Sequence, residues 1–118
     1  MKIKLCVNSD KKTVVLVYFF EYGGSSVFKE KCSEEDKFDW KIGLGLCLSK
    51  IYGRHKKWKM HREFFRNKNT HKLDYKKYSY WCINEIFNNN QIVLNDIENQ
   101  LKKSGEVDFE RFFVPINR

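Results

Sequence analysis

The first 32 residues constrain the fold most, because three strand-like runs follow one another there with only short turns between them. Residues 2–8 alternate apolar and polar side chains, and residues 13–22 form a longer run that is rich in β-branched and aromatic residues. A third alternating run follows the glycine pair at 23–24. Turns of this length join antiparallel neighbours. The sequence therefore predicts an N-terminal three-stranded antiparallel β-meander over residues 1–32.

The acidic stretch after the third run predicts the start of a helix rather than a ligand site. Asp39 is in position to cap a helix that begins at Trp40, and Ser33 has the capping-box spacing to Asp36. Carboxylates near a helix N-terminus also offset its positive end. A phosphate-binding loop is disfavoured, because such a loop needs glycines before the helix, and acids occupy that place here.

The helix predicted over residues 39–53 has apolar side chains on all sides, which is typical of a helix that is buried over most of its surface. Gly43 and Gly45 interrupt it, and each lowers helix propensity by about 1 kcal/mol relative to alanine. Such a cost indicates that another backbone packs closely at this point. Gly53 is expected to end the helix as a C′ residue.

The C-terminal half predicts more helices and an arm. A second helix ends at the asparagine run 88–90. Residues 92–94 are expected to form a short strand, after which Asn95 caps a third helix that closes at Gly105. The aromatic residues near the C-terminus suggest an arm that docks on its own core or on a second subunit.

These patterns together predict one α+β domain over residues 1–118, which is long enough to bury a substantial core. It consists of an N-terminal three-stranded antiparallel β-meander followed by about three α-helices and an extended C-terminal arm. Its parts are the meander at 1–32, the buried core helix at 39–53, a basic segment at 54–77, a helical part at 75–104 and the arm at 105–118.

The positive charge of the chain is concentrated in one stretch. The formal net charge is +8, and the stretch Lys50–Lys77 holds eleven basic residues against two acidic ones, so the rest of the chain is close to neutral. Clustering of this kind favours an anionic partner such as nucleic acid, nucleotide phosphates or an acidic protein face. The alternative is a solvated face that only keeps the protein in solution.

Basic and aromatic residues are interleaved within this stretch, which is typical of a surface that binds phosphates with its cations and stacks bases on its rings. The predicted contacts to phosphate or to an acidic protein face are Arg54, Lys56, Lys57, Arg62 and Arg66, and the predicted stacking or anchoring residues are Trp58 and Phe65. The alternative is an amphipathic helix or ordered loop in which Trp58, Met60 and Phe64 or Phe65 seal the core.

No residue pattern indicates catalysis or a metal site. The three histidines all fall in the basic segment, and the four cysteines are widely spaced, which is typical of reduced and mostly buried thiols. No C-x-x-C or H-x3-H pair indicates zinc. We therefore expect a protein that is not an enzyme and that needs no cofactor. No apolar run approaches the roughly 18 residues of a membrane span, and the N-terminus lacks a signal peptide, so we expect a cytoplasmic protein.

Residues 31–50, KCSEEDKFDWKIGLGLCLSK, resemble a pattern found in small proteins of phages and prophages of low-GC bacteria. In that pattern, K-C-S-x-E-D-x-F-D, a strand ends in Lys-Cys, and a short acidic run and Phe-Asp lead into a glycine-containing helix. The resemblance covers residues 12–53, and it implies a phage-type origin in an AT-rich genome. The matching positions are Lys31, Cys32, Ser33, Glu35, Asp36, Phe38, Asp39 and Gly43.

The resemblance implies an origin more than an activity, and a small, non-catalytic phage-type protein is most similar to the antagonists of bacterial immunity, which act in the host cytoplasm. The first hypothesis is an anti-CRISPR-like inhibitor that binds a Cas effector or its guide RNA through the basic segment. The alternative is a sponge that sequesters a small anionic nucleotide, such as a cyclic nucleotide or a cyclic ADP-ribose-type signal. Many anti-CRISPR proteins are acidic DNA mimics, whereas a net charge of +8 favours binding an anion.

A third hypothesis is a small DNA-binding phage regulator, because residues 91–109 loosely resemble a helix-turn-helix segment. Its supposed recognition helix carries both acids and lysines, whereas the basic residues cluster elsewhere. A homo-oligomer that forms through the aromatic surface and the C-terminal arm is a further expectation.

Overall fold

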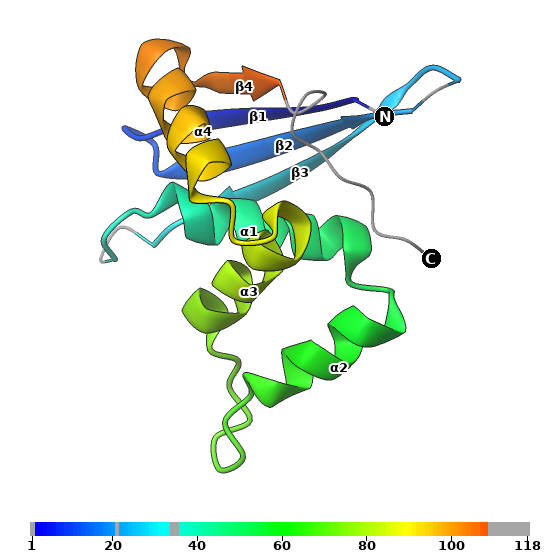
Figure 1. Ribbon diagram of the computed structural model, residues 1–118. Coiled ribbons are helices and arrows are strands. Elements are labelled where there is room, and N and C mark those ends of the chain that lie inside the picture. Colours follow the sequence, from blue (N-terminus) through cyan, green and yellow to red (C-terminus); the bar gives the residue numbers. More distant parts are fainter. Residues whose placement is uncertain (1, 21, 34–35, 109–118) are drawn as a thin grey trace.

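The computed structural model describes residues 2–20, 22–33 and 36–108, which form a mixed α+β fold (Figure 1). The elements in chain order are β1 (Lys2–Asn8), β2 (Thr13–Phe19), β3 (Ser25–Lys31), α1 (Trp40–Tyr52), α2 (Lys56–Phe64), α3 (Tyr75–Phe87), α4 (Gln91–Ser104) and β4 (Glu106–Asp108). The predicted α+β class and the N-terminal β-meander are confirmed.

The sheet has four antiparallel strands in the order β3-β2-β1-β4. Leu5 at its centre pairs with Leu16 on one side and with Val107 on the other, and Leu16 pairs in turn with Phe28. Side chains at paired positions share a face of a sheet, so these four form one apolar row toward the helices. The fourth strand falls in the segment that was expected to be an arm, because Val107 completes this row.

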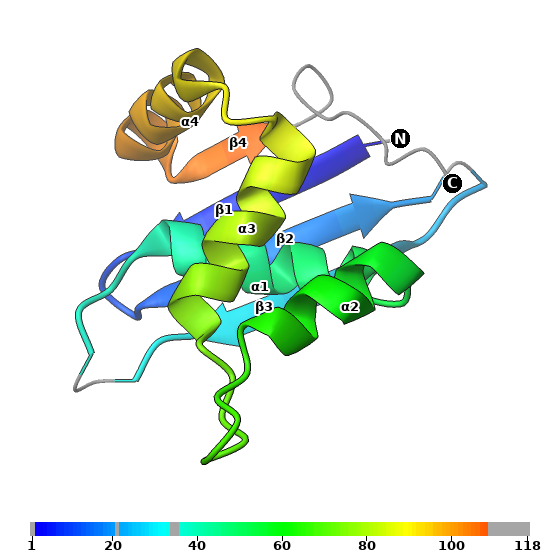
Figure 2. The ribbon, with the colours of Figure 1, turned by 60° about the horizontal axis from the view of Figure 1, so that its bottom comes forward.

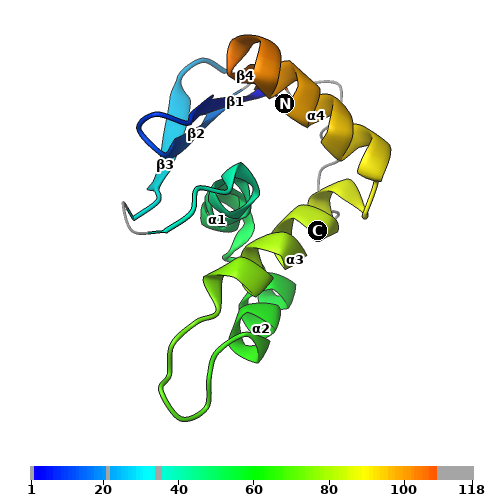
Figure 3. The same ribbon diagram turned by 90° about the vertical axis from the view of Figure 1, so that its left-hand side faces the viewer.

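The helix α1 lies between the sheet and α3, as Figure 3 shows. A Cβ atom at Gly43 would lie 2.4 Å from Cγ2 of Val14 in β2, and one at Gly45 would lie 2.3 Å from the backbone oxygen of Ser79 in α3. The two glycines therefore let α1 approach a strand with one side and a helix backbone with another. The predicted close backbone approach is confirmed at Gly45, whereas Gly43 meets a side chain.

The start of α1 is where the sequence predicts it, but its end has a different geometry. Asp39 is the N-cap, and its Oδ1 accepts a hydrogen bond of 2.9 Å from the Lys41 backbone N–H. Gly53 follows the last helical residue with a right-handed φ of −63°. The expected C′ geometry at this glycine is therefore absent, since the chain turns directly toward α2. The capping-box spacing at Ser33 and Asp36 lies before the helix and does not start it.

The prediction for residues 91–105 is partly wrong. These residues form one continuous helix, α4, which starts at Gln91 with Asn90 as its N-cap, so there is neither a strand at 92–94 nor a cap at Asn95. The Oδ1 atom of Asn90 accepts a hydrogen bond of 3.2 Å from the Val93 N–H. The helix ends at Gly105 as predicted, with a left-handed φ of 73°. A helix-turn-helix is also absent from this segment, because α4 is followed directly by β4.

The expectation of a docking arm lies outside the described residues from 109 onward. Within the described part of the chain, none of the helices combines the length and the apolar character that crossing a membrane requires.

Candidate nucleic-acid interface

The helix α2 buries one side chain, a tryptophan, against the rest of the molecule. The Trp58 side chain is 0% exposed, and its ring lies 5.5 Å from that of Tyr52 and 5.1 Å from that of Trp81. Trp58 is the only buried residue that α2 contributes. The structure therefore corrects the prediction of Trp58 as a stacking residue for a partner: a ring of this size stabilises the fold more by leaving water than by facing it.

The basic residues around α2 outnumber the acids that could pair with them. Lys57 forms an ion pair with Glu85 of α3, and Arg66 donates to Glu63 at 3.0 Å and to the His71 carbonyl at 2.8 Å. The other eight basic residues from Arg54 to Lys77 are exposed, and within the described part of the chain their side chains have no hydrogen bond or ion pair. They form what we call the basic surface: Arg54, Lys56, Lys59, Arg62, Lys68, Lys72, Lys76 and Lys77.

The loop that joins α2 to α3 is ordered by its own hydrogen bonds. The Asn67 backbone N–H donates to Lys72 O at 2.8 Å, and the Oδ1 atom of Asn67 accepts from the backbone N–H groups of Asn69 and Thr70. An isolated bridge between Arg66 and Leu73 closes the loop at its base. Two cations of the basic surface, Lys68 and Lys72, therefore stand on a defined turn.

The helix α2, which carries Lys56, Lys59 and Arg62 of the basic surface, lies farther from the sheet than α1 does, as Figure 3 shows. In Figure 2, α2, the loop at residues 65–74 and the start of α3 are neighbours at one end of the molecule. The two acids of this region are already engaged, since Glu63 pairs with Arg66 and Asp74 caps α3 through a bond from the Lys77 N–H. The cations are thus not neutralised by neighbouring carboxylates.

The aromatic residue that α2 presents to water is Phe64 and not Phe65. Phe65 is half-buried with its ring 6.1 Å from that of Tyr78, whereas Phe64 is 75% exposed and Met60, one turn earlier, is 53% exposed. The spacing of seven residues from Trp58 to Phe65 places both rings on one side of a helix with 3.6 residues per turn. The spacing thus groups Phe65 with Trp58 and leaves Phe64 on another side of α2, and the burial of Trp58 decides which side faces water.

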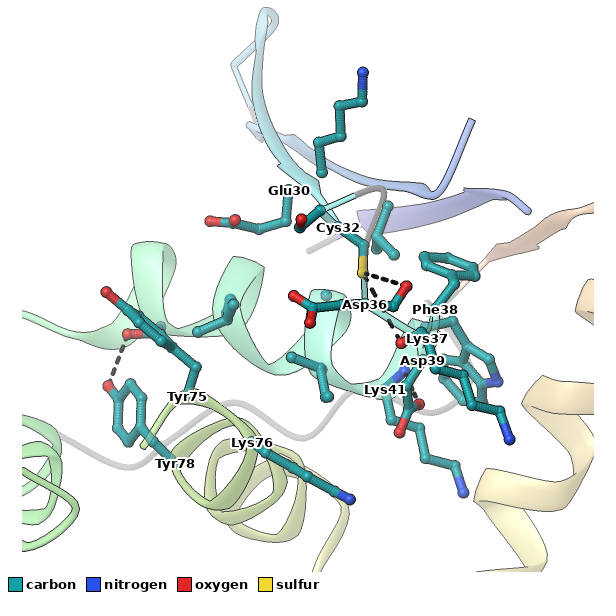
Figure 4. A pocket seen from close by; sticks show the side chains of 18 of the residues that line it. Glu30, Cys32, Asp36, Lys37, Phe38, Asp39, Lys41, Tyr75, Lys76 and Tyr78 are labelled. Carbon is teal, nitrogen blue, oxygen red and sulfur yellow. Dashed lines mark hydrogen bonds between the residues drawn. The ribbon is translucent and has the colours of Figure 1, made fainter. Parts of the chain in front are cut away.

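An open groove of about 1140 Å³ runs along α1, between residues 30–41 and the start of α3 (Figure 4). Six cations and four carboxylates line it, so its charge is mixed. Glu30 is paired with Lys50 at 2.6 Å, and Lys50 also donates to the Lys29 carbonyl at 3.0 Å. Figure 4 shows Asp36 on the wall opposite Tyr75 and Lys76.

One end of the groove holds a partly buried hydrogen bond between α3 and the start of α1. The Tyr80 hydroxyl donates to Oδ2 of Asp39, the residue that caps α1 with its other oxygen. Burial, together with the charge and the hydrogen bond of Asp39, raises the pKa of Tyr80 to about 12. Tyr80 is therefore protonated at neutral pH and couples α3 to the N-terminus of α1.

The cysteines do not form a reactive centre among the described residues. All four are free thiols, and Cys47 and Cys82 are fully buried. Burial raises the pKa of each of these two thiols to about 12, which keeps them protonated and poorly nucleophilic. The described residues contain no group of three or more side chains that could hold a metal ion.

No protein-family model, curated protein or solved structure matches the chain.

Proposed function

We propose that the protein binds RNA through the basic surface, and that it does so as an anti-CRISPR-like inhibitor of a Cas effector whose guide RNA it contacts. The observation that carries the proposal is the set of eight exposed cations on the turn before α2, on α2, on the following loop and at the start of α3, whose side chains have no described partner. A protein gains affinity for RNA mainly when such cations replace the counterions of the phosphates.

The arrangement of these cations favours a long anion over a small one. They are spread over a turn, the helix α2, a loop and the start of α3. A small nucleotide, in contrast, is normally held in a concave site that covers most of its surface. The concave site here is the groove, where four carboxylates stand among six cations, so no purely positive pocket for a small phosphate is formed. Arg62 and Lys76 belong to both the basic surface and the groove, whereas the other six cations of the basic surface lie outside it. A polymer can contact more of these cations than a small nucleotide in the groove can, so a nucleotide sponge is less well supported.

The resemblance of residues 31–50 to small phage proteins supports a phage-type origin, and the immune-antagonist role is proposed because small non-catalytic phage proteins are similar to that class. The residues that carry the resemblance have structural positions here: Asp39 caps α1 and Gly43 packs on Val14. They support a shared scaffold, while the basic surface lies outside the matched stretch.

The test is RNA binding by a double variant of the basic surface. We expect the protein to bind a labelled oligouridine of about 15 nucleotides. The double variant Lys56→Ala with Arg62→Ala should weaken binding by roughly tenfold for each phosphate interaction that it removes. The matched control is Lys102→Ala with Lys103→Ala, which removes the same charge from the last turn of α4. Fluorescence anisotropy over a salt series measures both variants.

The salt series adds a quantitative check. The logarithm of the association constant should fall linearly with the logarithm of salt concentration, and eight phosphate contacts on a single strand limit the slope to about −6. The double variant should have a shallower slope and should fail to inhibit cleavage by a guide-loaded Cas effector. The proposal is wrong if the wild-type protein binds no RNA, or if the two double variants bind equally well.

A further inference from the structure

The exposed ring of Phe64 lies on the outward side of α2 in line with a cation and a thioether. Lys56, Met60 and Phe64 follow one another at a spacing of four residues, which places them along one face of the helix. The same face is opposite to the one that buries Trp58. A phenylalanine that is 75% exposed in this position has apolar surface free for a partner.

Phe64 is the outer end of an aromatic stack that reaches the core. Its ring meets the edge of the His61 ring at 5.6 Å and 80°, and His61 lies flat on Trp81 at 4.5 Å and 13°. Trp81 in turn contacts the buried rings of Tyr78 at 6.1 Å and Trp58 at 5.1 Å. The exposed ring is therefore supported by packed neighbours and is not a free side chain on a helix.

The histidine in the middle of the stack is held in place by the backbone. Its Nδ1 atom lies 2.9 Å from the Lys57 carbonyl oxygen and donates to it when it carries the proton. Lys57 is itself fixed by its ion pair with Glu85 of α3. The Phe64 ring, which packs on this ordered histidine, loses little conformational freedom when a ligand stacks on it. More of the free energy of stacking therefore appears as affinity.

An exposed aromatic ring with cations around it is suited to nucleic acid, because the ring can stack on a base while the cations bind the neighbouring phosphates. Every nucleobase has a flat π-face, and stacking one base on an aromatic side chain contributes about 1–3 kcal/mol. A base in an RNA duplex is already stacked between its neighbours inside the double helix. An aromatic side chain on the convex surface of a protein helix therefore cannot reach it. Unpaired bases are the ones that can splay out onto a ring.

We propose that Phe64 is a stacking platform for an unpaired base, so that the ligand of the basic surface is single-stranded rather than double-stranded RNA. This inference rests on the proposed function and adds the form of RNA that is recognised. Phosphates on either side of the stacked base are then bound by cations of the same helix, among them Lys56 and Lys59.

The experiment compares single-stranded oligouridine with an RNA duplex of equal length at one salt concentration. Phe64→Ala should weaken binding of the single strand by roughly 5- to 150-fold, as expected when one base no longer stacks on a ring, and should leave duplex binding unchanged. Phe64→Trp should retain the affinity. Tyr22→Ala is the matched control, because Tyr22 is a 98% exposed aromatic residue in the turn between β2 and β3.

Phe64→Leu separates stacking from apolar docking. Leucine keeps apolar surface and good helix propensity but has no π-face, so it should bind the single strand as weakly as Phe64→Ala. If Phe64→Ala binds the single strand like the wild type, or if Phe64→Leu retains full affinity, stacking at Phe64 is refuted while RNA binding stands. If the wild-type protein binds neither RNA, the proposed function itself is refuted.

Discussion

Gly45 has no room for a side chain, because a Cβ atom there would lie 2.3 Å from the backbone oxygen of Ser79. Alanine gains about 1 kcal/mol of helix propensity over glycine, but here it must push α1 and α3 apart. We expect Gly45→Ala to lower the free energy of unfolding by about 1–3 kcal/mol, as measured by urea unfolding followed by circular dichroism.

Gly43 provides the comparison for this prediction. A Cβ atom there meets the Val14 side chain, with Cγ2 at 2.4 Å, and not a backbone. Truncation to Val14→Ala should therefore recover part of the loss caused by Gly43→Ala, so that the two changes together cost less than their sum. No truncation of a side chain can relieve Gly45→Ala. A Gly45→Ala protein as stable as the wild type would contradict the packing of α1 on α3.

At the scale of elements, the start of α4 can be tested with two asparagines. Asn90 caps the helix through Val93 N–H, whereas the side chain of Asn95 only accepts from the Gln91 amide at 2.9 Å on the helix surface. Asn90→Ala should lower the unfolding free energy by about 1 kcal/mol. Asn95→Ala should be neutral or slightly stabilising, since alanine is the better helix former. Urea unfolding distinguishes the two variants. A larger loss of stability for Asn95→Ala than for Asn90→Ala would place the helix start at Asn95.

The elements differ in how far the sequence could predict them. The strands of the meander have a local signal, namely a period of two and turn residues between the runs. The start of α4 was missed because its β-branched Ile92 and Val93 look like a strand. The helical conformation is favoured by the longer pattern of Val93, Ile97 and Leu101. These residues are four positions apart, and all three pack against the core.

The candidate site was predictable in its charge, whereas its exposed aromatic residue was predictable only once the burial of Trp58 is known. A count of lysines and arginines is enough to identify the basic segment. Which ring faces solvent depends on the rotation of α2, and that rotation is set by Trp58 packing against Tyr52 and Trp81 from other helices. The fourth strand was missed for a similar reason: three residues have almost no pattern, and β4 exists because β1 offers it an edge.

The layers of the whole molecule separate stability from binding. The sheet, α1 and α3, which are packed together in Figure 3, hold most of the buried apolar residues. The helices α2 and α4 and the loop before α3 contribute one each, Trp58, Ile97 and Leu73, and α2 also carries exposed cations. Changes to the exposed residues of α2 should therefore affect binding with little effect on unfolding. The core helices, in contrast, contain the groups that link stability to pH.

Stability should fall in alkaline solution, because three groups of α1 and α3 resist ionisation in the folded protein. Burial raises the pKa of Cys47 and Cys82 from 9.0 to about 12, and burial with Asp39 raises that of Tyr80 from 10.0 to about 12. At a pH between the pKa of the unfolded chain and that of the folded chain, these groups have released their protons in the unfolded chain but retain them in the folded one. The folded state then binds more protons than the unfolded one, so the unfolding free energy decreases as pH rises.

The stabilisation from these groups is fully present below about pH 9 and is lost as pH approaches 12. Urea midpoints should accordingly stay level up to that point and then decline, and Cys82→Ala should decline less steeply because it lacks one of the titrating groups. The fully exposed change Tyr22→Ala should follow the wild-type curve. A midpoint that is constant across the alkaline range would show that these three groups are not shielded from water. It would contradict the packing of α1 on the sheet at Cys47, whose Sγ lies 3.5 Å from the Phe28 carbonyl oxygen, and the burial of Cys82 and Tyr80 in α3.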